Sequence, residues 1–471
     1  MKRIYDIALF TFALLLAASP CALAQDGEER PATYDENATA ESLGLEPYAA
    51  PDGLYPVFPW DHLASWGDKY QSIEDGIKSM AECGCTLSAF VADDRGVKLA
   101  KENGLRCIYE LDLETFDERN LSEEEIQKKL DAIDAHVKER VQSTKDDPAV
   151  IGYNLRDEPG VYLFRSLAAA VAAVKKYAPG KLAYINLFPG YASTIGADVD
   201  SQLGTYSYRE YLERYVQEVK PQFLSYDNYM VEYSEDMLQL NRASVYFSDL
   251  FEVRDVAQKY KLPFWFIGSS LCIMEDSTPP TPARYAYQAY TALAAGAEGM
   301  TWFLYYPLGW KESPIDENGN KTLSWIYMRD INQQVQALGK YLLAYRSTEL
   351  GMTPIYSKEE APNLPQFPEV PKNVLKNLTC RLSTSAGEYE NAEPKIMVGE
   401  FAQKDGDRVA ALAVDLSFSR SVKINFEIPD GYKTVKVVSQ LDGSETAVSE
   451  ESLKEGFWII PGHGKLFVFE K

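Results

Sequence analysis

The stretch Ile151-Gly152-Tyr153-Asn154-Leu155-Arg156-Asp157-Glu158-Pro159-Gly160 is an apolar run that ends in three charged residues and is stopped by a proline. A short apolar run with this ending is typical of a buried parallel strand whose carboxyl end opens to solvent. Proline lacks the N–H group that would continue the strand pairing. The sequence therefore predicts a strand that presents Asp157 and Glu158 at its carboxyl end.

This run belongs to a series of short apolar or β-branched runs that alternate with amphipathic helical stretches. The eight predicted strands are Tyr55–Trp60, Thr86–Val91, Leu105–Leu111, Val150–Leu155, Leu182–Leu187, Phe223–Asp227, Pro263–Ile267 and Gly299–Tyr305. Strands that alternate with helices pair in parallel and are wrapped by the helices. Eight repeats predict an α/β fold, a (β/α)8 TIM barrel over residues 53–350.

The links between these elements indicate which end of the barrel is elaborated. Links from helix to strand are short, whereas the strand-to-helix segments 188–207, 268–280 and 306–321 are long. The strand-to-helix loops of a β/α barrel build its active face. We therefore expect the functional site at the carboxyl ends of the strands.

The helix expected after the third strand has clear local signals. Ser122 and Glu125 have the spacing of a capping box at its start. The apolar stripe that follows consists of Ile126, Leu130, Ile133, Val137 and Val141. Because these residues recur at helical spacing, we expect them to pack in the core.

A proline-rich connector follows Arg346, and strand-like runs separated by turn signals follow the connector. These runs are Arg408–Val414, Val422–Phe426, Thr434–Val438 and Lys465–Phe469. Patterning with strands alone predicts a small C-terminal antiparallel β-sandwich over residues 351–471. Residues 25–52 form an N-terminal segment ahead of the barrel.

Residues 1–24 have the three zones of a secretory signal peptide. Basic residues at positions 2 and 3 precede an apolar run over 7–18, and Ala22-Leu23-Ala24 is a small-residue cleavage site. The run is shorter than the roughly 20 apolar residues of a bilayer span, and no later run is long enough. We expect a periplasmic or extracellular protein without a transmembrane helix. Lipid attachment at Cys21 is an alternative, which the preceding Pro20 disfavours.

The composition narrows the classes of partner. The 471-residue chain has a formal net charge of −23, which argues against a nucleic-acid partner. Its 31 Tyr and 7 Trp residues offer aromatic faces on which sugars can stack, although aromatic residues also fill cores. The cysteines lack the spacing of a disulfide framework or a zinc site, and there are only 3 histidines. We expect no structural metal and no cofactor.

The carboxyl groups at the end of the fourth strand suit acid catalysis. A carboxyl group that is half-buried beside aromatic residues loses hydration, and its pKa rises toward the range useful to a general acid. The alternative is that Arg156, Asp157 and Glu158 form a salt-linked rim without chemistry.

Other strand ends supply candidates for binding a substrate through hydrogen bonds or stacking. The candidate substrate-binding residues are Trp60, Asp61, Glu110, Asp157, Asn186, Tyr229, Trp302 and Tyr305. Each has an alternative role in packing or helix capping. We predict that six of the strand-end side chains all open onto one face, namely Trp60, Glu110, Glu158, Asn186, Asp227 and Trp302.

Three segments carry a resemblance to a known family. They are the Asp157-Glu158-Pro159 ending, Tyr184-Ile185-Asn186-Leu187-Phe188-Pro189, and the run Ala294–Met300 before the last predicted strand. Together they resemble clan A glycoside hydrolases, especially β-galactosidase-like and polysaccharide-utilisation barrels. The resemblance covers residues 55–350. It implies that Glu158, which closes the fourth strand, is the acid/base residue that protonates the leaving group.

The sequence departs from this family at the seventh strand. The family's nucleophile is a glutamate at the end of that strand, whereas here the strand ends Ile267-Gly268-Ser269. Either Glu275 in the following loop or Asp227 at the end of the sixth strand is then the second carboxylate, and we favour Asp227. A gap of about 6.5–9.5 Å between the two carboxyl groups implies inversion, and one near 5 Å implies retention. Asp227 has alternatives as a hydroxyl-binding or helix-capping residue.

The resemblance favours hydrolysis of an oligosaccharide or polysaccharide, with two alternatives. A non-catalytic glycan-binding protein on a barrel scaffold is favoured by the missing glutamate. A polysaccharide lyase or sugar isomerase would use Asp157 or Asp227 as a base, but a metal-dependent isomerase needs more histidine ligands than the chain offers.

Export gives the first test. We expect the mature chain to begin at Gln25 and to be found outside the cytosol, because the signal features are complete. Mass spectrometry of the N-terminus after cell fractionation measures this. An uncleaved chain in the cytosol would contradict the prediction.

Overall fold

The computed structural model describes residues 33–63, 69–196, 201–232, 237, 239–273, 279–383 and 393–471. The expected signal peptide and Glu275 lie outside these residues. Within them, none of the helices has the length and the hydropathy that a bilayer span requires.

Seven strands of the first part of the chain form two parallel sheets. One sheet has the order β1 (Val57–Pro59), β7 (Gly299–Phe303), β6 (Phe264–Ser269) and β5 (Leu224–Asp227), and the other has the order β2 (Cys107–Glu110), β3 (Val150–Asp157) and β4 (Leu182–Asn186). Every pairing within these sheets is parallel. The prediction of an α/β fold built on parallel strands is confirmed.

Isolated parallel bridges continue the pairing between the two sheets. Leu187, directly after β4, pairs with Tyr226 of β5. On the other side, the segment predicted as the second strand bridges to both neighbours, because Phe90 pairs with His62 after β1 and Val91 pairs with Tyr109 of β2. Each predicted strand of the barrel region thus makes parallel contacts with the strands next to it.

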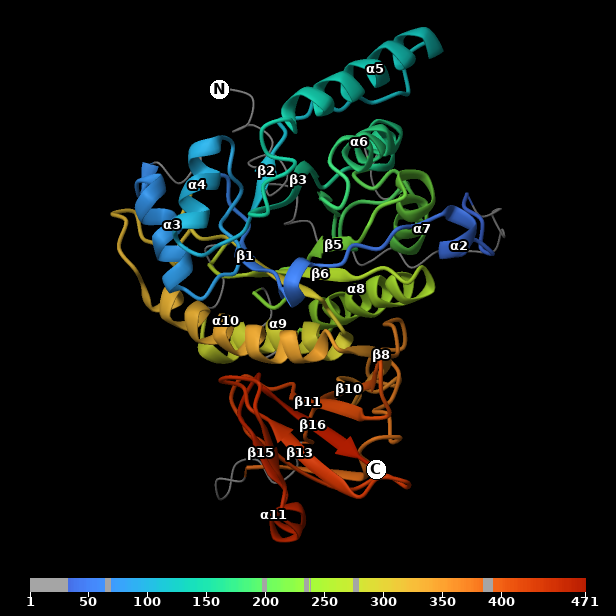
Figure 1. Ribbon diagram of the computed structural model, residues 1–471. Coiled ribbons are helices and arrows are strands. Elements are labelled where there is room, and N and C mark those ends of the chain that lie inside the picture. The colour runs from blue at the N-terminus through green and yellow to red at the C-terminus, as the bar shows by residue number, and fades with distance from the viewer. Residues whose placement is uncertain are drawn as a thin grey trace.

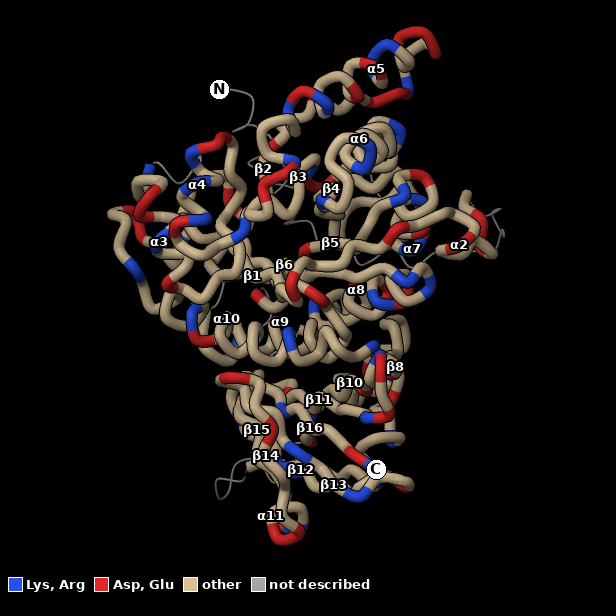
Figure 2. Tube along the Cα trace, in the orientation of Figure 1, with Lys and Arg blue, Asp and Glu red and all other residues tan. Residues whose placement is uncertain are grey.

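Helices surround these strands, as Figure 1 shows. They are α3 (Ile73–Glu82), α4 (Asp94–Glu102), α5 (Glu123–Arg140), α6 (Phe164–Tyr177), α7 (Tyr208–Arg214), α8 (Leu240–Lys259), α9 (Pro282–Ala295) and α10 (Leu323–Leu342). The capping box predicted for α5 is present, with reciprocal hydrogen bonds between Ser122 and Glu125. Acidic and basic positions are interspersed along α5 (Figure 2). Its apolar stripe packs inward, as predicted.

The two faces of each strand serve different clusters, because side chains alternate with a period of two along a strand. Phe58, Tyr184 and Trp265 belong to a compact aromatic cluster between the strands. Residues of opposite parity, such as Phe266 and Trp302, belong to the large cluster shared with the helices. Whether a residue near the end of a strand faces the inside of the strand ring or the helices therefore depends on its position along the strand.

The C-terminal strands are antiparallel. One sheet has the order β14 (Glu445–Ala447), β13 (Thr434–Val438), β16 (Gly464–Glu470), β11 (Val409–Asp415), β10 (Ile396–Gln403) and β8 (Tyr345–Met352), and the other has the order β15 (Phe457–Ile459), β12 (Val422–Glu427) and β9 (Lys376–Leu382). The two sheets enclose one buried cluster that includes Val398, Ile424 and Phe467. β8 crosses residue 350, so antiparallel pairing begins shortly before the predicted boundary.

The six-stranded sheet packs directly on α9, above the C-terminal strands in Figure 1. Gly399 of β10 marks the closest approach, because a Cβ atom there would lie 1.9 Å from the carbonyl oxygen of Ala294. Only glycine permits this distance between strand and helix. Both faces of the six-stranded sheet are therefore covered.

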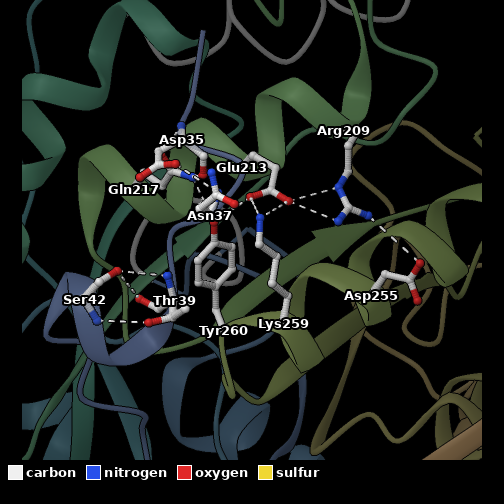
Figure 3. A network of polar contacts seen from close by, with 10 residues as sticks. All are labelled: Asp35, Asn37, Thr39, Ser42, Arg209, Glu213, Gln217, Asp255, Lys259 and Tyr260. Atoms are coloured by element: carbon white, nitrogen blue, oxygen red, sulfur yellow. Dashed lines mark hydrogen bonds and ion pairs between the residues drawn. The ribbon is translucent and has the colours of Figure 1, made fainter. Parts of the chain in front are cut away.

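The N-terminal segment is held by a polar network centred on Glu213, shown in Figure 3. Glu213 is 1% exposed and accepts hydrogen bonds from Lys259 at 3.0 Å and from the Tyr260 hydroxyl at 2.6 Å. Gln217 donates to the same hydroxyl and to the backbone carbonyl of Asp35, each at 2.8 Å. Further along, the backbone N–H of Tyr48 donates to the carbonyl of Gln222, which leads the chain into β1.

Removal of Glu213 tests this network. We expect Glu213→Ala to lower the free energy of unfolding by about 2 kcal/mol, because it leaves the Tyr260 hydroxyl and Lys259 without their shared acceptor. Glu218→Ala removes the exposed partner of Arg214 on the same stretch and should cost less than about 1 kcal/mol. Urea denaturation of both variants measures the difference. Equal losses would contradict the role given to Glu213.

Candidate active site

Polar side chains from neighbouring strands meet at the carboxyl ends of the sheet. Glu110 ends β2, Asp157 ends β3, Asn186 ends β4 and Asp227 ends β5. Asp157 pairs in register with Asn186, and the bridge after β4 brings Asn186 next to Asp227. Glu158 directly follows β3. The strand order thus gathers four carboxyl groups and one amide on one rim.

Asn186 is the link between two of the carboxyl groups. Its Nδ2 donates to Oδ1 of Asp157 at 3.1 Å and to Oδ1 of Asp227 at 2.8 Å. Its Oδ1 accepts a hydrogen bond from the Ser225 hydroxyl at 3.1 Å, which fixes the amide orientation. Both amide hydrogens are therefore used to hold carboxylates that would otherwise repel each other.

Glu158 occupies an unusual backbone conformation. Its φ is 42°, in the left-handed region that costs a residue with a Cβ about 1–2 kcal/mol. A backbone hydrogen bond of 2.9 Å from Glu158 N to the carbonyl oxygen of Asn186 holds it there. β3 also contains a register shift between Asn154 and Arg156, which changes the direction of the residues after it. Strain held at one residue in this way is typical of functional positions.

The Glu158 and Asp227 side chains share a hydrogen bond. Asp227 is 1% exposed, and its Oδ2 receives no bond from an N–H or hydroxyl group of the described residues. Glu158 is half-buried. A proton on Glu158 gives Asp227 the donor that it lacks, so one of the two carboxyl groups stays protonated.

The pKa values follow from this arrangement. Burial, then the charge of Asp227, then that of Asp157 raise the pKa of Glu158 well above its usual range. Burial and the Asp157 charge also raise the pKa of Asp227, although the hydrogen bonds from Asn186 and Glu158 oppose this rise. Burial among protein atoms also raises the pKa of Asp157, whose side chain nevertheless remains open to solvent. The contact between Glu158 and Asp227 raises the pKa of Glu158 and lowers that of Asp227, so Glu158 keeps the proton that the pair shares.

Glu110 lies next to this group and pairs with a histidine. His62 Nδ1 contacts Oε1 of Glu110, and Nδ2 of Asn154 donates to Oε2 at 3.1 Å. Burial by itself would lower the pKa of His62, but Glu110, followed by Asp157, raises it overall. The charged form of His62 is favoured, so it partly balances the negative rim.

Three predicted binding residues lie in the core instead, which corrects the expectation for them. Asp61 is fully buried, accepts the backbone N–H of Tyr305 at 2.6 Å, and has a pKa raised well above its usual range by burial. Trp302 is fully buried and donates to Asn332 of α10 at 2.8 Å. Tyr305 is fully buried and contacts Ser79 and Trp325 through its hydroxyl. None of the three presents a surface to a sugar.

Aromatic rings beside the carboxyl groups come from other positions. Phe303, at the end of β7, is partly exposed and packs on Trp60 at 6.1 Å, on Tyr229 at 5.3 Å and on Trp310 at 5.4 Å between ring centroids. Burial, followed by the nearby charge of Asp227, raises the pKa of Tyr229 above its usual range. Trp60 and Tyr229 are thus placed beside the rim. The sequence analysis did not single out Phe303. Because side chains alternate along a strand, Phe303 lies on the same face of β7 as Thr301 and on the opposite face from Trp302, and this alternation could have identified it.

The end of β6 carries no carboxylate of its own but contacts one. Ser269 donates to Oε2 of Glu232 at 2.8 Å, and the backbone N–H of Ile273 donates to its Oε1. Glu232 is 1% exposed and follows β5. Sequence reasoning missed it, because nothing local to Glu232 indicates that its loop folds onto β6.

Among the described residues, no group of three or more His, Cys, Asp or Glu side chains is arranged to hold a metal ion.

Sequence comparisons give no family. No protein-family model matches the chain, and no curated protein matches it significantly. Any assignment by relationship therefore rests on the fold.

Solved structures do resemble this fold. A catalytic mutant of a GH42 β-galactosidase from G. stearothermophilus superimposes with a TM-score of 0.57 at 7% identity, over 91% of this chain and 100% of that one. A glycoside hydrolase family 5 structure from Bacteroides vulgatus gives 0.50 at 10% identity, over 92% and 95%. A third, described as a glycoside hydrolase, gives 0.51 at 10% identity, over 92% and 98%.

These similarities place the chain among proteins with the parallel α/β architecture of TIM-barrel glycoside hydrolases. Because the sequence identities are only 7% and 10%, the similarities establish the fold alone. The predicted resemblance to clan A glycoside hydrolases is confirmed in this respect.

The raised pKa of Glu158 predicts a pH-dependent stability. An unfolded Glu releases its proton near pH 4, whereas folded Glu158 keeps its proton to a higher pH, so this residue lowers stability as the pH rises above that value. Glu158→Gln should therefore be increasingly stabilising, relative to wild type, as the pH rises from about 4 to 8. Urea denaturation across this range measures the gap. A gap that stays constant would contradict the prediction.

Proposed function

We propose that this protein is an exported glycoside hydrolase with a closed (β/α)8 barrel and Glu158 as its proton donor. The observation that carries the proposal is the state of Glu158, a half-buried carboxyl at the end of β3 whose pKa is raised well above its usual range beside a second carboxyl group. A group in this state can hold a proton at neutral pH and give it to a leaving oxygen. The similarity to glycoside hydrolase folds supports the same class of reaction.

Closure of the barrel is supported by hydrogen bonds on both sides of the two parallel sheets. Leu187 N donates to the carbonyl of Ser225 at 2.8 Å, and Thr86 N donates to that of Val57 at 2.8 Å. Val91 N donates to the carbonyl of Ile108 at 3.1 Å. Together with the pairings inside the two sheets, these contacts link eight parallel segments into a ring. The carboxyl ends of the segments carry the proposed site.

The proposed reaction begins with the hydrogen bond between Glu158 and Asp227. A glycosidic oxygen that enters between the two carboxyl groups accepts the proton of Glu158, and its bond to the anomeric carbon breaks. The oxygen of a water molecule then bonds to that carbon while its proton passes to Asp227. Asn186 steadies Asp227 through its 2.8 Å hydrogen bond as the charges shift. Phe303, which is partly exposed and packed against Trp60 and Tyr229, provides a face for a sugar ring.

The spacing of the two carboxyl groups must change when substrate binds. The two carboxyl groups interact directly, whereas the carboxyl groups of inverting enzymes lie about 6.5–9.5 Å apart and leave room for a water molecule. A substrate that replaces the mutual hydrogen bond separates them. Water activation by Asp227 then corresponds to inversion.

A non-catalytic glycan-binding protein is the second candidate. The specific observation in its favour is Ser269 at the end of β6, where the resembling enzymes are expected to have a glutamate. Glu232 accepts hydrogen bonds on both of its oxygens, from Ser269 and from the backbone N–H of Ile273, and this holds it away from a substrate. A binding protein needs the same aromatic and polar groups but no proton transfer.

Replacement of Glu158 by glutamine separates the two candidates. Glu158→Gln keeps the shape but cannot deliver a proton, so turnover of a natural glycoside should fall by about 10²–10⁴-fold. A nitrophenyl glycoside has a good leaving group and should lose less. Initial rates on both substrates after a reducing-sugar screen of plant and host glycans measure this contrast.

Asp112→Asn is a control, because it removes a charge near the rim at another left-handed position. It should change turnover far less than Glu158→Gln does. Equal turnover by wild type and Glu158→Gln would remove Glu158 from the mechanism and favour the binding protein.

A further inference from the structure

The three-stranded sheet β15-β12-β9 has one covered face and one open face. Its covered face packs on the six-stranded sheet through residues such as Val422, Ile424 and Ile459. The six-stranded sheet lies between this cluster and α9. The other face of the three-stranded sheet therefore points away from the barrel.

A row of side chains crosses this open face. Lys423 of β12 pairs in register with Trp458 of β15 on one side and with Arg381 of β9 on the other. Residues that face each other across neighbouring strands lie on the same side of a sheet. The side chains of Arg381, Lys423 and Trp458 are thus aligned across three strands.

The indole of Trp458 remains accessible although both cations approach it. Its exposed fraction is 45%, and Ile460, two residues later, is 55% exposed. Lys423 Nζ lies 5.6 Å and the Arg381 guanidinium carbon 5.8 Å from the ring centroid. β15 is the edge strand of the sheet, so the ring is open on the side away from the two cations.

Arg381 and Lys423 have no acidic ion-pair partner within the part of the chain that the structure describes; their recorded contacts are with the Trp458 ring. This is unusual in a chain with 70 acidic and 47 basic side chains. By contrast, Lys376, at the start of β9, pairs with Asp430 at 2.8 Å. The two cations beside Trp458 are available to an external anion.

We propose that this row, formed by Arg381, Lys423 and Trp458, is a binding site for an anionic glycan, separate from the carboxyl rim of the barrel. The exposed indole stacks on the apolar face of a sugar ring. The guanidinium and ammonium groups bind a carboxylate or sulfate group of the same or the next sugar. The site holds a polysaccharide on the sandwich and does no chemistry.

A glycan fits this face better than other partners. A specific protein interface buries about 800 Å² on each partner around an apolar centre, whereas the apolar part of this row consists of Trp458 and Ile460. Nucleic acid is disfavoured by the overall charge of −23. An open sheet face with one exposed stacking ring and cationic neighbours suits a chain of sugar rings.

The carboxyl rim and the sandwich row have opposite preferences. Asp157, Glu158 and Asp227 repel an anionic sugar at the rim, whereas the row attracts one. If the barrel hydrolyses glycans as proposed above, the substrate is then a polysaccharide with both neutral and acidic sugars. The binding inference itself does not depend on hydrolysis.

Native electrophoresis of the full chain in gels that contain a glycan tests the site. Polygalacturonate carries carboxylates, dextran sulfate carries sulfates, and dextran is neutral. We expect retardation by polygalacturonate or dextran sulfate and none by dextran, and the more effective polymer identifies the anion. Trp458→Ala should weaken this affinity by about tenfold. Arg381→Gln combined with Lys423→Gln should do the same while the fold is kept, since both residues are on the surface.

Leu441→Ala is the matched control, because Leu441 is 82% exposed on the other sheet of the sandwich and should not affect binding. Turnover of a nitrophenyl glycoside by the Trp458 and cation variants should equal that of wild type, which separates this inference from the function of the barrel. Three results would overturn the site: no retardation by either anionic glycan, wild-type affinity in Trp458→Ala, or binding of oligothymidylate as strong as that of the glycans.

Discussion

The two hydrogen bonds that the Asn186 amide donates hold the proposed site together. Asp157 and Asp227 lie close to each other and to Glu158, and unscreened repulsion would drive them apart. The amide occupies the space between the two aspartates and satisfies one oxygen of each. With those oxygens fixed, Oδ2 of Asp227 is buried without an N–H or hydroxyl donor among the described residues. Glu158 must keep its proton to lie beside Asp227, because two ionised carboxylates would repel each other. The acid state of Glu158 therefore depends on an uncharged side chain of the next strand.

A rim of this kind lowers the stability of the fold, because it buries carboxyl groups that prefer water and holds Glu158 at a positive φ. Tight contacts elsewhere offset that loss. Glu213 holds Lys259 and Tyr260, and Gln217 links Tyr260 to Asp35 of the N-terminal segment. The six-stranded sheet lies on α9 at a distance that only Gly399 permits. Both devices stiffen the scaffold at places remote from the rim, so the strand ends keep their positions.

The sequence was a good guide to strands and a weaker guide to side-chain direction. All eight predicted runs take part in parallel pairing, since buried strands require continuous apolar residues and their ends require charged or turn-forming ones. Trp302 and Phe303 show the limit. The two are neighbours, and only Trp302 was among the predicted substrate-binding residues, yet Trp302 faces α10 and Phe303 faces the rim. A residue's chemistry is visible in a sequence, but the phase of a short strand is set by its partners.

Local sequence by itself determined the helices, the strands and their order, and it placed Glu158 at a strand end, because periodicity and capping act over a few residues. Tertiary structure alone decided which carboxyl group approaches Glu158, that Glu232 folds onto the end of β6, and that Lys423 stands between Arg381 and Trp458. These are contacts between segments far apart in the chain. Their geometry arises from strand register, the bulge in β3 and burial, and those quantities exist only after the strands have paired.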